Sequence, residues 1–335
     1  MEIRQALLKS EIERVRAFLT SFDLRYDARI QDTLYAEEDG ILVGTVSRAD
    51  SLIECLAIDP SLQGENLAGK LVSELLVLMR EKGILHQMVY TLSAHAAAFE
   101  AMNFRLLADT GKVAILEGGT GSIEEAMEGL KKRIRGKWTE DDPDTAAIVV
   151  NCNPITLGHL GLIEYAASRH ARLLLFVVEE DLSTFTYKER FSLIHLAVKE
   201  LGNVLVLPST PYIVSSLTFP GYFLKSMDEK EEEHARLDAI LFRDRFMKDL
   251  GIAKRYVGTE TDLFMVKYNG ILQAALGERL EVVPRFQKEG TTISASIVRR
   301  LIFENRIEEA LAFVPEATRP LLRQIAKGKY EASRG

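Results

Sequence analysis

Apolar runs and helical periodicities alternate along the second half of the chain. Each apolar run is short enough to be a buried strand, and most are followed by a stretch in which hydrophobic residues recur every three or four positions. The predicted strands are 146–150, 173–179, 203–207, 255–257 and 280–283, and the predicted helices are 158–169, 187–199, 228–250, 294–303 and 306–313. This alternation predicts a doubly wound, Rossmann-like parallel sheet, in which ligands bind at the carboxyl ends of the strands.

The first third has a different pattern, with β-leaning runs on both sides of one long helix. Apolar residues recur at helical spacing from Leu67 to Met79 and stop at Lys82-Gly83. The other predicted elements are strands at 41–46, 52–58 and 88–92, a small-residue helix at 94–101 and a hairpin of 104–108 with 112–116. This pattern predicts a separate α/β domain.

A change of composition separates these two parts. The stretch 117–144 opens with glycines, contains one amphipathic helical piece at 123–134 and ends in an acidic, proline-bearing turn. We therefore predict a front domain at 1–138, with a linker helix at about 117–138, and a second domain at 139–335. Two domains also suit 335 residues, because a domain averages roughly 150.

Composition and charge restrict the class of function. The chain has 49 acidic and 42 basic residues, a net charge of −7, which argues against a surface that tracks duplex nucleic acid. No apolar run approaches the ~20 residues that span a bilayer, and the N-terminus lacks the apolar middle of a signal peptide. Cys55 and Cys152 are the only cysteines, so we expect no disulfide and no multi-cysteine metal site. We predict a cytoplasmic protein without nucleic-acid or membrane partners.

The segment IVVNCNPITLGHLGLIEYA follows the first strand of the second half. A polar loop ends at Thr156, and a helix begins near Gly158-His159, so the hydroxyl and the imidazole, three residues apart, share a face of the first turn. Gly158 allows close approach to the backbone, and the helix N-terminus offers N–H groups to an anion. This arrangement suits a phosphate. The alternative is that Thr156 only caps the helix and His159 packs against the sheet.

A second phosphate-type motif, ISASIVRRL, lies near the end of the chain. Ser294 is a good N-cap residue, and Ser296 and Arg299 share one face near the positive end of the same predicted helix. Hydroxyls, helix amides and a guanidinium together suit a polyphosphate. Taken alone, this motif is better interpreted as an ordinary capped helix. The two motifs together, in this order within a strand–helix chain, are more specific.

These paired motifs resemble those of the HxGH-type nucleotidyltransferase superfamily. Within it, the segments FTYKERFSLI, NVLVLPSTPYIVSSLTFPGYFLK and RYVGTETDLFMVKYNGIL look like the citrate lyase ligase family, and the similarity covers the whole second half. That family also has an acetyltransferase-like domain in front, which the first third matches.

The resemblance implies an ATP-dependent ligase. Such an enzyme activates acetate as acetyl-adenylate, releases pyrophosphate, and passes the acetyl group to the thiol of a CoA-derived arm on the acyl carrier subunit of citrate lyase. Acetate is ionised at neutral pH, so the attack needs no general base. Mg²⁺ is expected between the phosphates, held mainly by phosphate and water oxygens, so no dense cluster of protein metal ligands is needed.

The resemblance also implies roles for individual residues. Three catalytic residues are expected: Thr156, His159 and Arg299. The expected nucleotide-binding residues are Asn153, Thr156, His159, Gly258, Glu260, Tyr268, Ser294, Ser296 and Arg299, with Thr259 in the same loop as Gly258, Glu260 and Tyr268. Arg190 and Lys225 are candidates for a phosphate or carboxylate contact, with a surface or structural charge as the alternative for each.

The front domain resembles the GNAT acetyltransferases. Gln63, Gly64, Asn66 and Ala68 match the loop that points backbone amides at the CoA pyrophosphate, although Asn66 stands where glycine is expected. Asparagine tolerates unusual backbone angles, so the loop can persist. Because no general base is evident, we expect this groove to dock the CoA-like arm and not to act as a second enzyme.

Two further features have plain structural interpretations. Cys152 could be read as a covalent acyl carrier, but a small buried hydrophobic residue at a strand end is the preferred interpretation. The run DEKEEEHARLD, 228–238, is interpreted as a solvated helix face, and its His234 has no metal partner in the sequence pattern.

The sequence leaves two alternatives to the ligase open. One is an adenylyltransferase that joins AMP to a phosphorylated precursor of the phosphopantetheine or nicotinamide-mononucleotide type. The other is a non-catalytic sensor of nucleotide or acyl-CoA. The sequence does not distinguish acetate from related acids.

Overall fold

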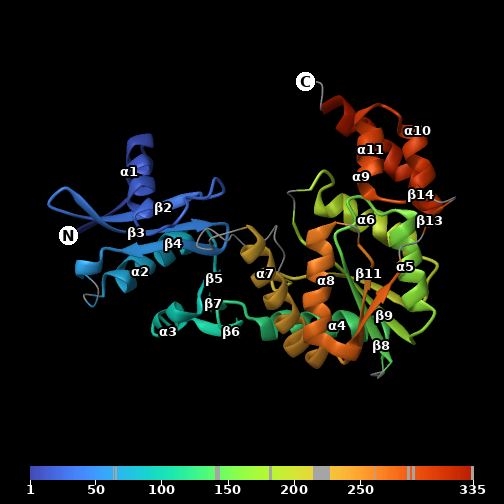
Figure 1. The fold of residues 1–335 in the computed structure, drawn as a ribbon, viewed down its shortest axis with the longest axis horizontal. Helices are drawn as coiled ribbons and strands as arrows, with labels where there is room; N and C mark the ends of the chain where they lie inside the picture. Colours follow the sequence, from blue (N-terminus) through green and yellow to red (C-terminus); the bar gives the residue numbers. More distant parts are fainter. Residues whose placement is uncertain are drawn as a thin grey trace. The chain divides into compact units, whose positions relative to one another are not determined.

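The structure is a computed structural model, and it describes residues 1–335 apart from 63, 65, 140–143, 181–182, 214–226, 261, 285–286, 289–290 and 333–335. The chain forms two compact units (Figure 1). Unit 1 comprises Met1–Glu125 and Phe219–Leu237, and unit 2 comprises Ala126–Thr218 and Asp238–Gly335. A segment from the middle of the chain therefore belongs with the first unit. The domain limits at 138 and 139 stay a prediction.

Unit 1 is built on a seven-stranded mixed sheet with the order β1-β2-β3-β4-β5-β7-β6. Its elements are β1 Glu2–Gln5, α1 Lys9–Thr20, β2 Asp32–Glu38, β3 Ile41–Ala49, β4 Leu52–Ile58, α2 Leu67–Glu81, β5 His86–Leu92, α3 Ala96–Glu100, β6 Arg105–Asp109 and β7 Val113–Gly119. Only β4 and β5 pair in parallel; the other neighbours in this sheet are antiparallel. The strands and helices predicted from Ile41 onward in this unit are found, with small shifts at their ends.

The parallel pair of unit 1 is short. Two residue pairs align β4 with β5, Leu52 with Met88 and Ile53 with Val89, and the ladder ends there. Just beyond, the pairing of β4 with β3 is irregular, and Cys55 has a φ of 54°. Two strands that stop pairing leave a gap between their remaining halves, which positions the cavity described below.

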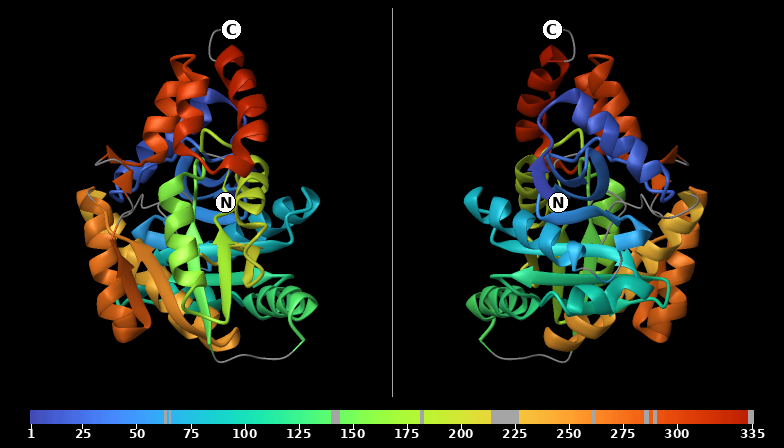
Figure 2. Two further views of the ribbon diagram at one scale, coloured as in Figure 1. Left: turned by 90° about the vertical axis from the view of Figure 1, so that its right-hand side faces the viewer. Right: turned by 90° about the vertical axis from the view of Figure 1, so that its left-hand side faces the viewer.

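Unit 2 contains a five-stranded parallel sheet with the order β10-β9-β8-β11-β12. Its elements are β8 Thr145–Val150, α5 Leu157–Ala167, β9 Arg172–Val177, α6 Tyr187–Val198, β10 Val204–Pro208, β11 Ile252–Gly258, α8 Leu263–Leu276, β12 Leu280–Val283, β13 Gln287–Lys288, β14 Thr291–Thr292, α9 Ala295–Phe303, α10 Ile307–Ala310 and α11 Arg319–Ala332. Figure 2 shows these strands and helices in two further views. The predicted α/β class and the doubly wound parallel sheet are confirmed.

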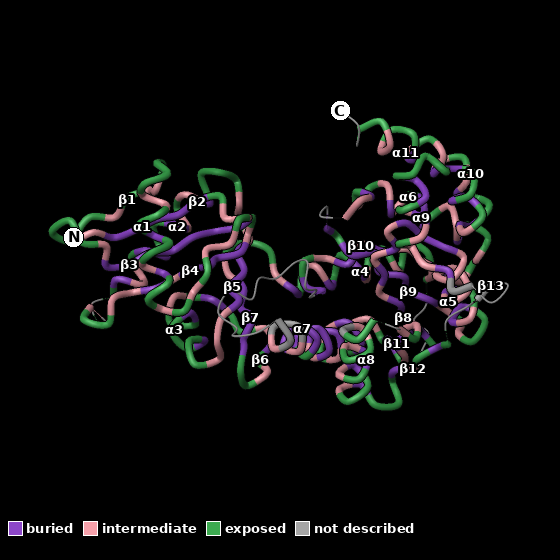
Figure 3. Tube along the Cα trace, turned by 45° about the horizontal axis from the view of Figure 1, so that its top comes forward, coloured by how far each residue is buried: buried purple, intermediate pink, exposed green. Residues whose placement is uncertain are grey.

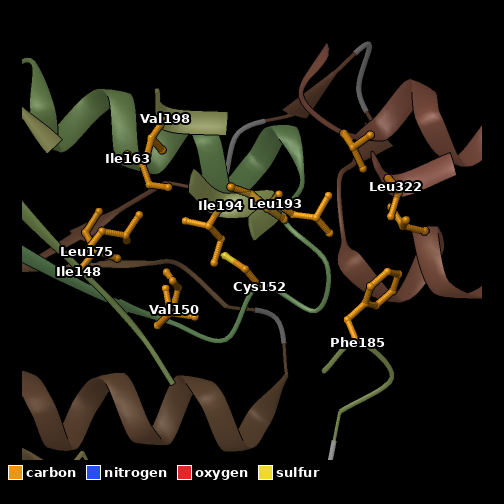
Figure 4. Close-up of a cluster of buried hydrophobic side chains, with 14 of the residues drawn as sticks. Ile148, Val150, Cys152, Ile163, Leu175, Phe185, Leu193, Ile194, Val198 and Leu322 are labelled. Carbon is orange, nitrogen blue, oxygen red and sulfur yellow. The ribbon is translucent and has the colours of Figure 1, made fainter. Parts of the chain in front are cut away.

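The cores explain why the apolar runs become strands. Leu173, Leu174, Leu175, Phe176 and Val177 are all fully buried in β9, as expected for a strand covered on both faces. Burial colouring shows β8 and β9 within the buried part of this unit, whereas its helices carry exposed residues on their outer sides (Figure 3). Figure 4 shows part of the cluster that joins β8 and β9 to α5 and α6.

Two helices span the division between the units, and both differ in part from expectation. The linker helix is α4, Ile123–Lys137, and it begins later than 117 because β7 extends to Gly119. The predicted helix 228–250 is α7, Met227–Leu241, followed by a π-helical turn at Phe242–Met247.

The interpretation of 228–238 as a solvated face is wrong for its second half. Glu233, His234 and Asp238 are all buried, and the His234 ring lies 5.4 Å from the ring of Tyr90. Charge composition alone therefore misjudged this helix. In the part of the chain that is described, no helix combines the length and the apolar character needed to cross a membrane.

Candidate functional site

The loop after β8 and the start of α5 form the first part of the site. Thr156 is the N-cap of α5, and its Oγ1 accepts the N–H of His159 at 3.5 Å. In return, Nδ1 of His159 accepts the N–H of Thr156 at 3.1 Å. Because this bond uses the Nδ1 lone pair, a neutral imidazole carries its proton on Nε2. The capping alternative and the site role are therefore compatible: the cap fixes the ring and its tautomer.

The start of α9 forms the second part. Ser294 caps this helix, with Oγ accepting the N–H of Ile297 at 3.4 Å. One turn further, Nη2 of Arg299 donates to Oγ of Ser296 at 3.0 Å, and Nη1 donates to the carbonyl oxygen of Asn153 at 2.5 Å. Burial lowers the pKa of Arg299 from its usual value, and at neutral pH the guanidinium keeps its charge.

The two motifs meet at one cavity of about 460 Å³ in unit 2. A Cβ built on Gly158 would lie 3.4 Å from the carbonyl oxygen of Ile293, so the helix starts approach closely where α5 lacks a side chain. The predicted residues that line this cavity are Thr156, His159, Gly258, Glu260, Tyr268, Ser294 and Ser296. Two helix N-termini and a set of hydroxyl groups thus face one space, which is an arrangement suited to an anion.

Tyr268 lies in α8 and not in the loop where it was expected. Its hydroxyl donates to Asp238 at 2.6 Å and accepts from Arg255 at 3.3 Å, while Arg255 and Asp238 form a buried ion pair at 2.9 Å. Burial raises the pKa of Tyr268, and the Asp238 charge adds to the effect. Arg255 also lines the cavity. Sequence reasoning missed it because a single arginine in a short strand gives no signal.

The structure places the candidate Arg190 away from the cavity wall. It is fully buried, and its guanidinium donates to main-chain oxygens, including those of Asn151 and Val178 at 3.0 and 2.9 Å. This geometry favours the structural alternative over a direct phosphate contact. The other candidate, Lys225, lies outside the described residues.

Asn153 uses its side chain within the protein. Its Oδ1 accepts the N–H of Phe185 at 3.0 Å, in addition to the bond that its carbonyl oxygen accepts from Arg299. Cys152, its neighbour, is buried, and burial raises the pKa of its thiol. A buried, protonated thiol fits the interpretation as a small hydrophobic residue and argues against a nucleophile.

Unit 1 has a cavity of its own, of about 870 Å³, between the diverging parts of β4 and β5. Ala68, in the first turn of α2, lines it. Gly64 has a φ of 100° and Asn66 a φ of 58°, so asparagine does occupy the left-handed conformation expected of it. Gln63 lies outside the described residues.

The cavity of unit 1 also has a residue that sequence reasoning missed. The carboxyl group of Glu54, on β4, is buried and lines the wall together with His95 and Tyr90. Glu54 stands in an otherwise apolar strand, LIECLAI, and that placement was the available signal. Among the described residues, no group of three or more histidine, cysteine, aspartate or glutamate side chains is arranged to hold a metal ion.

Together, the fold and this cavity define an α/β protein whose parallel-sheet unit presents two helix N-termini and several hydroxyl groups to one space. The model of the citrate lyase ligase C-terminal domain matches residues 145–322. The chain belongs to the citrate lyase ligase family, as the sequence motifs predicted.

Relatives and solved structures extend this comparison. The chain is 36% identical to the citrate (pro-3S)-lyase ligase of Klebsiella pneumoniae, with 98% of each chain covered, and 31% identical to that of Haemophilus influenzae, covering 95% of this chain and 97% of the relative. A GNAT-family acetyltransferase structure from Desulfovibrio desulfuricans is 16% identical and covers 35% of this chain and 98% of its own, with a TM-score of 0.30.

Proposed function

We propose that the protein is an ATP-dependent ligase that acetylates the thiol of a CoA-derived arm on the acyl carrier subunit of citrate lyase. An acetate oxygen attacks the α-phosphorus of ATP, the bond to the bridging oxygen of the β-phosphate breaks, and pyrophosphate leaves. The sulfur of the arm then attacks the acetyl carbon, AMP leaves, and the thiol proton passes to solvent. Acetylation of the arm activates citrate lyase.

The observation that carries this proposal is the meeting of the α5 and α9 N-termini at one cavity. A phosphate chain bound there would receive helix amides, the Thr156 and Ser296 hydroxyls and the Nε2 proton of His159. Arg299, bonded to Ser296, would hold the β- and γ-phosphates and the departing pyrophosphate. Carboxylate attack requires no general base, and none is needed in this set.

Mg²⁺ fits this arrangement as a partner of the nucleotide. Because the described residues offer no cluster of three protein ligands, the ion would be held mainly by phosphate and water oxygens, as is usual for Mg²⁺ with nucleotides. Its contribution is to neutralise charge on the phosphates. Both described cysteines are free thiols, and the acceptor is also a thiol, so a reducing cytoplasm is the compartment we assign.

The cavity of unit 1 is the proposed docking site of the CoA-derived arm. The halves of β4 and β5 beyond Ile53 and Val89 make no ladder with each other, so an extended arm with amide groups can lie between them. Gly64 and Asn66, both at positive φ, precede the N-terminus of α2, where the arm's phosphates would bind. Isothermal titration of the full chain with CoA and with dephospho-CoA tests this, and absence of binding by both would contradict it.

The central experiment measures pyrophosphate release from Mg-ATP across a panel of short carboxylic acids. We expect acetate to support both release and acetate-dependent ATP–pyrophosphate exchange. Exchange driven only by a phosphorylated precursor would instead show an adenylyltransferase. ATP binding without any pyrophosphate release would show a sensor.

A further inference from the structure

The guanidinium of Arg190 is fully buried, which is unusual for a charged group. Desolvating a charge is costly unless charge-assisted hydrogen bonds replace the lost water. Arg190 lies in the first turns of α6, where a long side chain points back toward the helix N-terminus. Its group donates to the main-chain oxygens of Asn151, Val178, Glu180 and Phe185. It thereby ties together the segments that follow β8 and β9.

The main chain of Phe185 links this guanidinium to the site. Nε of Arg190 donates to the Phe185 carbonyl oxygen at 3.1 Å, while the Phe185 N–H donates to Oδ1 of Asn153 at 3.0 Å. The Phe185 ring is itself buried in the core of unit 2 (Figure 4). The main chain of Phe185 is therefore held by hydrogen bonds at its N–H and at its carbonyl oxygen, and the N–H holds the Asn153 side chain in turn.

From Asn153 the hydrogen bonds continue to the cavity. Its carbonyl oxygen accepts from Nη1 of Arg299, and Nη2 of Arg299 donates to Oγ of Ser296, which lines the wall. One continuous chain thus runs from Arg190 through Phe185, Asn153 and Arg299 to Ser296. A displacement of the loop at Asn153 would move the Arg299 group with it.

A second branch supports the same loop. Nδ2 of Asn151 donates to Oγ of Ser183 at 3.3 Å, and Ser183 donates to the carboxylate of Glu180. That carboxylate lies 3.6 Å from Nη2 of Arg190. The buried ion pair of Arg190 and Glu180 therefore supports both asparagines of the loop after β8.

We infer that Arg190 and Asn153 are positioning residues for the polyphosphate-binding part of the cavity, with the Asn153 side chain acting as a hydrogen-bond acceptor within the protein and not as a phosphate ligand. The identity of the nucleotide as ATP rests on the proposed function. Direct phosphate binding by Asn153 would require the side-chain N–H groups as donors, whereas positioning requires only Oδ1.

Two substitutions at Asn153 separate these roles. Asn153→Asp keeps an acceptor oxygen but adds a negative charge, which a phosphate ligand could not tolerate. Asn153→Leu keeps the approximate size but removes the acceptor. Positioning predicts that the aspartate variant resembles the wild type and the leucine variant does not. A phosphate-ligand role predicts that the aspartate variant is the worse of the two.

The experiment is the dissociation constant of Mg-ATP for the full chain, measured by isothermal titration, with melting temperature recorded for each variant. We expect Asn153→Asp to bind within about 3-fold of the wild type, and Asn153→Leu and Arg190→Lys each to bind at least ~10-fold more weakly. Since both residues act through the main chain of Phe185, the double variant should bind Mg-ATP at most about 3-fold more weakly than the weaker-binding single variant.

Weaker binding by Asn153→Asp than by Asn153→Leu, multiplying effects in the double variant, or a wild type that binds no Mg-ATP would each overturn the inference. If Arg190→Lys does not fold, the Asn153 pair decides alone. Acetate-dependent exchange by the wild type reports separately on the proposed function. A chain that binds Mg-ATP but does not exchange would contradict that function, and the affinities would still decide the positioning roles.

Discussion

The two cavities of this protein are formed at different places in a sheet. The cavity of unit 1 is the larger, about 870 Å³ against about 460 Å³, and it opens where a parallel ladder stops between β4 and β5. Most of its wall is aliphatic and aromatic, and the charged residues Asp23, Arg25 and Glu54 also line it. The cavity of unit 2 lies at the carboxyl ends of parallel strands, and hydroxyls, an imidazole and two helix N-termini face it.

The cavity of unit 1 suits the binding of a long flexible group, whereas the cavity of unit 2 suits the stabilisation of charge that develops during a reaction. A gap with main-chain edges can bind an extended arm through buried area and backbone hydrogen bonds. A reaction at phosphorus needs donors that are fixed before the charge develops. The smaller cavity is therefore the one in which we place the chemistry.

The largest expected effect tests that placement. His159→Ala removes the Nε2 donor and should lower acetate-dependent pyrophosphate release by ~100-fold or more, the scale of losing one transition-state donor. Steady-state release measures it, with His195→Ala, an exposed histidine of α6, as the matched control. Near-wild-type turnover of His159→Ala would contradict the placement of the reaction in the cavity of unit 2.

Arg299→Lys should have the next largest effect. Lysine keeps the charge but cannot bond to the Asn153 carbonyl and the Ser296 hydroxyl at once in the same geometry. We expect kcat/KM for exchange to fall by about 10-fold, which corresponds to ~1.4 kcal/mol. Arg300→Lys, at a neighbouring and largely exposed position, is the control and should exchange normally. Full activity of Arg299→Lys would mean that charge alone matters at this position.

Filling the other cavity should separate the two half-reactions. Ala68→Phe places a large side chain in the wall of the unit 1 cavity and should weaken CoA binding by about 10-fold, a cost within the ~1–3 kcal/mol of overpacking. Exchange uses the other cavity and should stay within about 2-fold. Lys70→Phe, exposed on the same helix, controls for surface effects. A loss of exchange in Ala68→Phe would contradict the proposal that the arm binds in one cavity and the exchange takes place in the other.

The smallest effect concerns the backbone at the start of α2. Asn66 has a φ of 58°, which asparagine and glycine adopt more readily than other residues. Asn66→Gly should leave the affinity for CoA unchanged. Asn66→Ala should lower the temperature of the first unfolding transition, because alanine in the left-handed conformation is strained by roughly 1 kcal/mol. Differential scanning calorimetry measures the transition. An unchanged transition in Asn66→Ala would show that the left-handed geometry is not required there.

Local patterns determined a great deal of this protein. Buried strands and amphipathic helices depend on residues close in sequence, so the parallel sheet of unit 2 could be predicted. The same holds for the Thr156–His159 cap and the Ser294 cap, because each is complete within one helical turn. The short motifs and their order indicated the superfamily, and the longer segments between them indicated the family.

Tertiary structure decided what no local pattern contains. Arg299 and Asn153 are 146 residues apart, and only folding brings them to hydrogen-bond distance. An arginine in a helix reads as a surface charge until packing shows, as for Arg190, that main-chain oxygens surround it. The acidic run at 228–238 likewise read as solvated, although burial there depends on its partners, as the ring of Tyr90 beside His234 shows. Sequence sets the local geometry of each donor, whereas burial and long-range contacts decide which donors remain for a ligand.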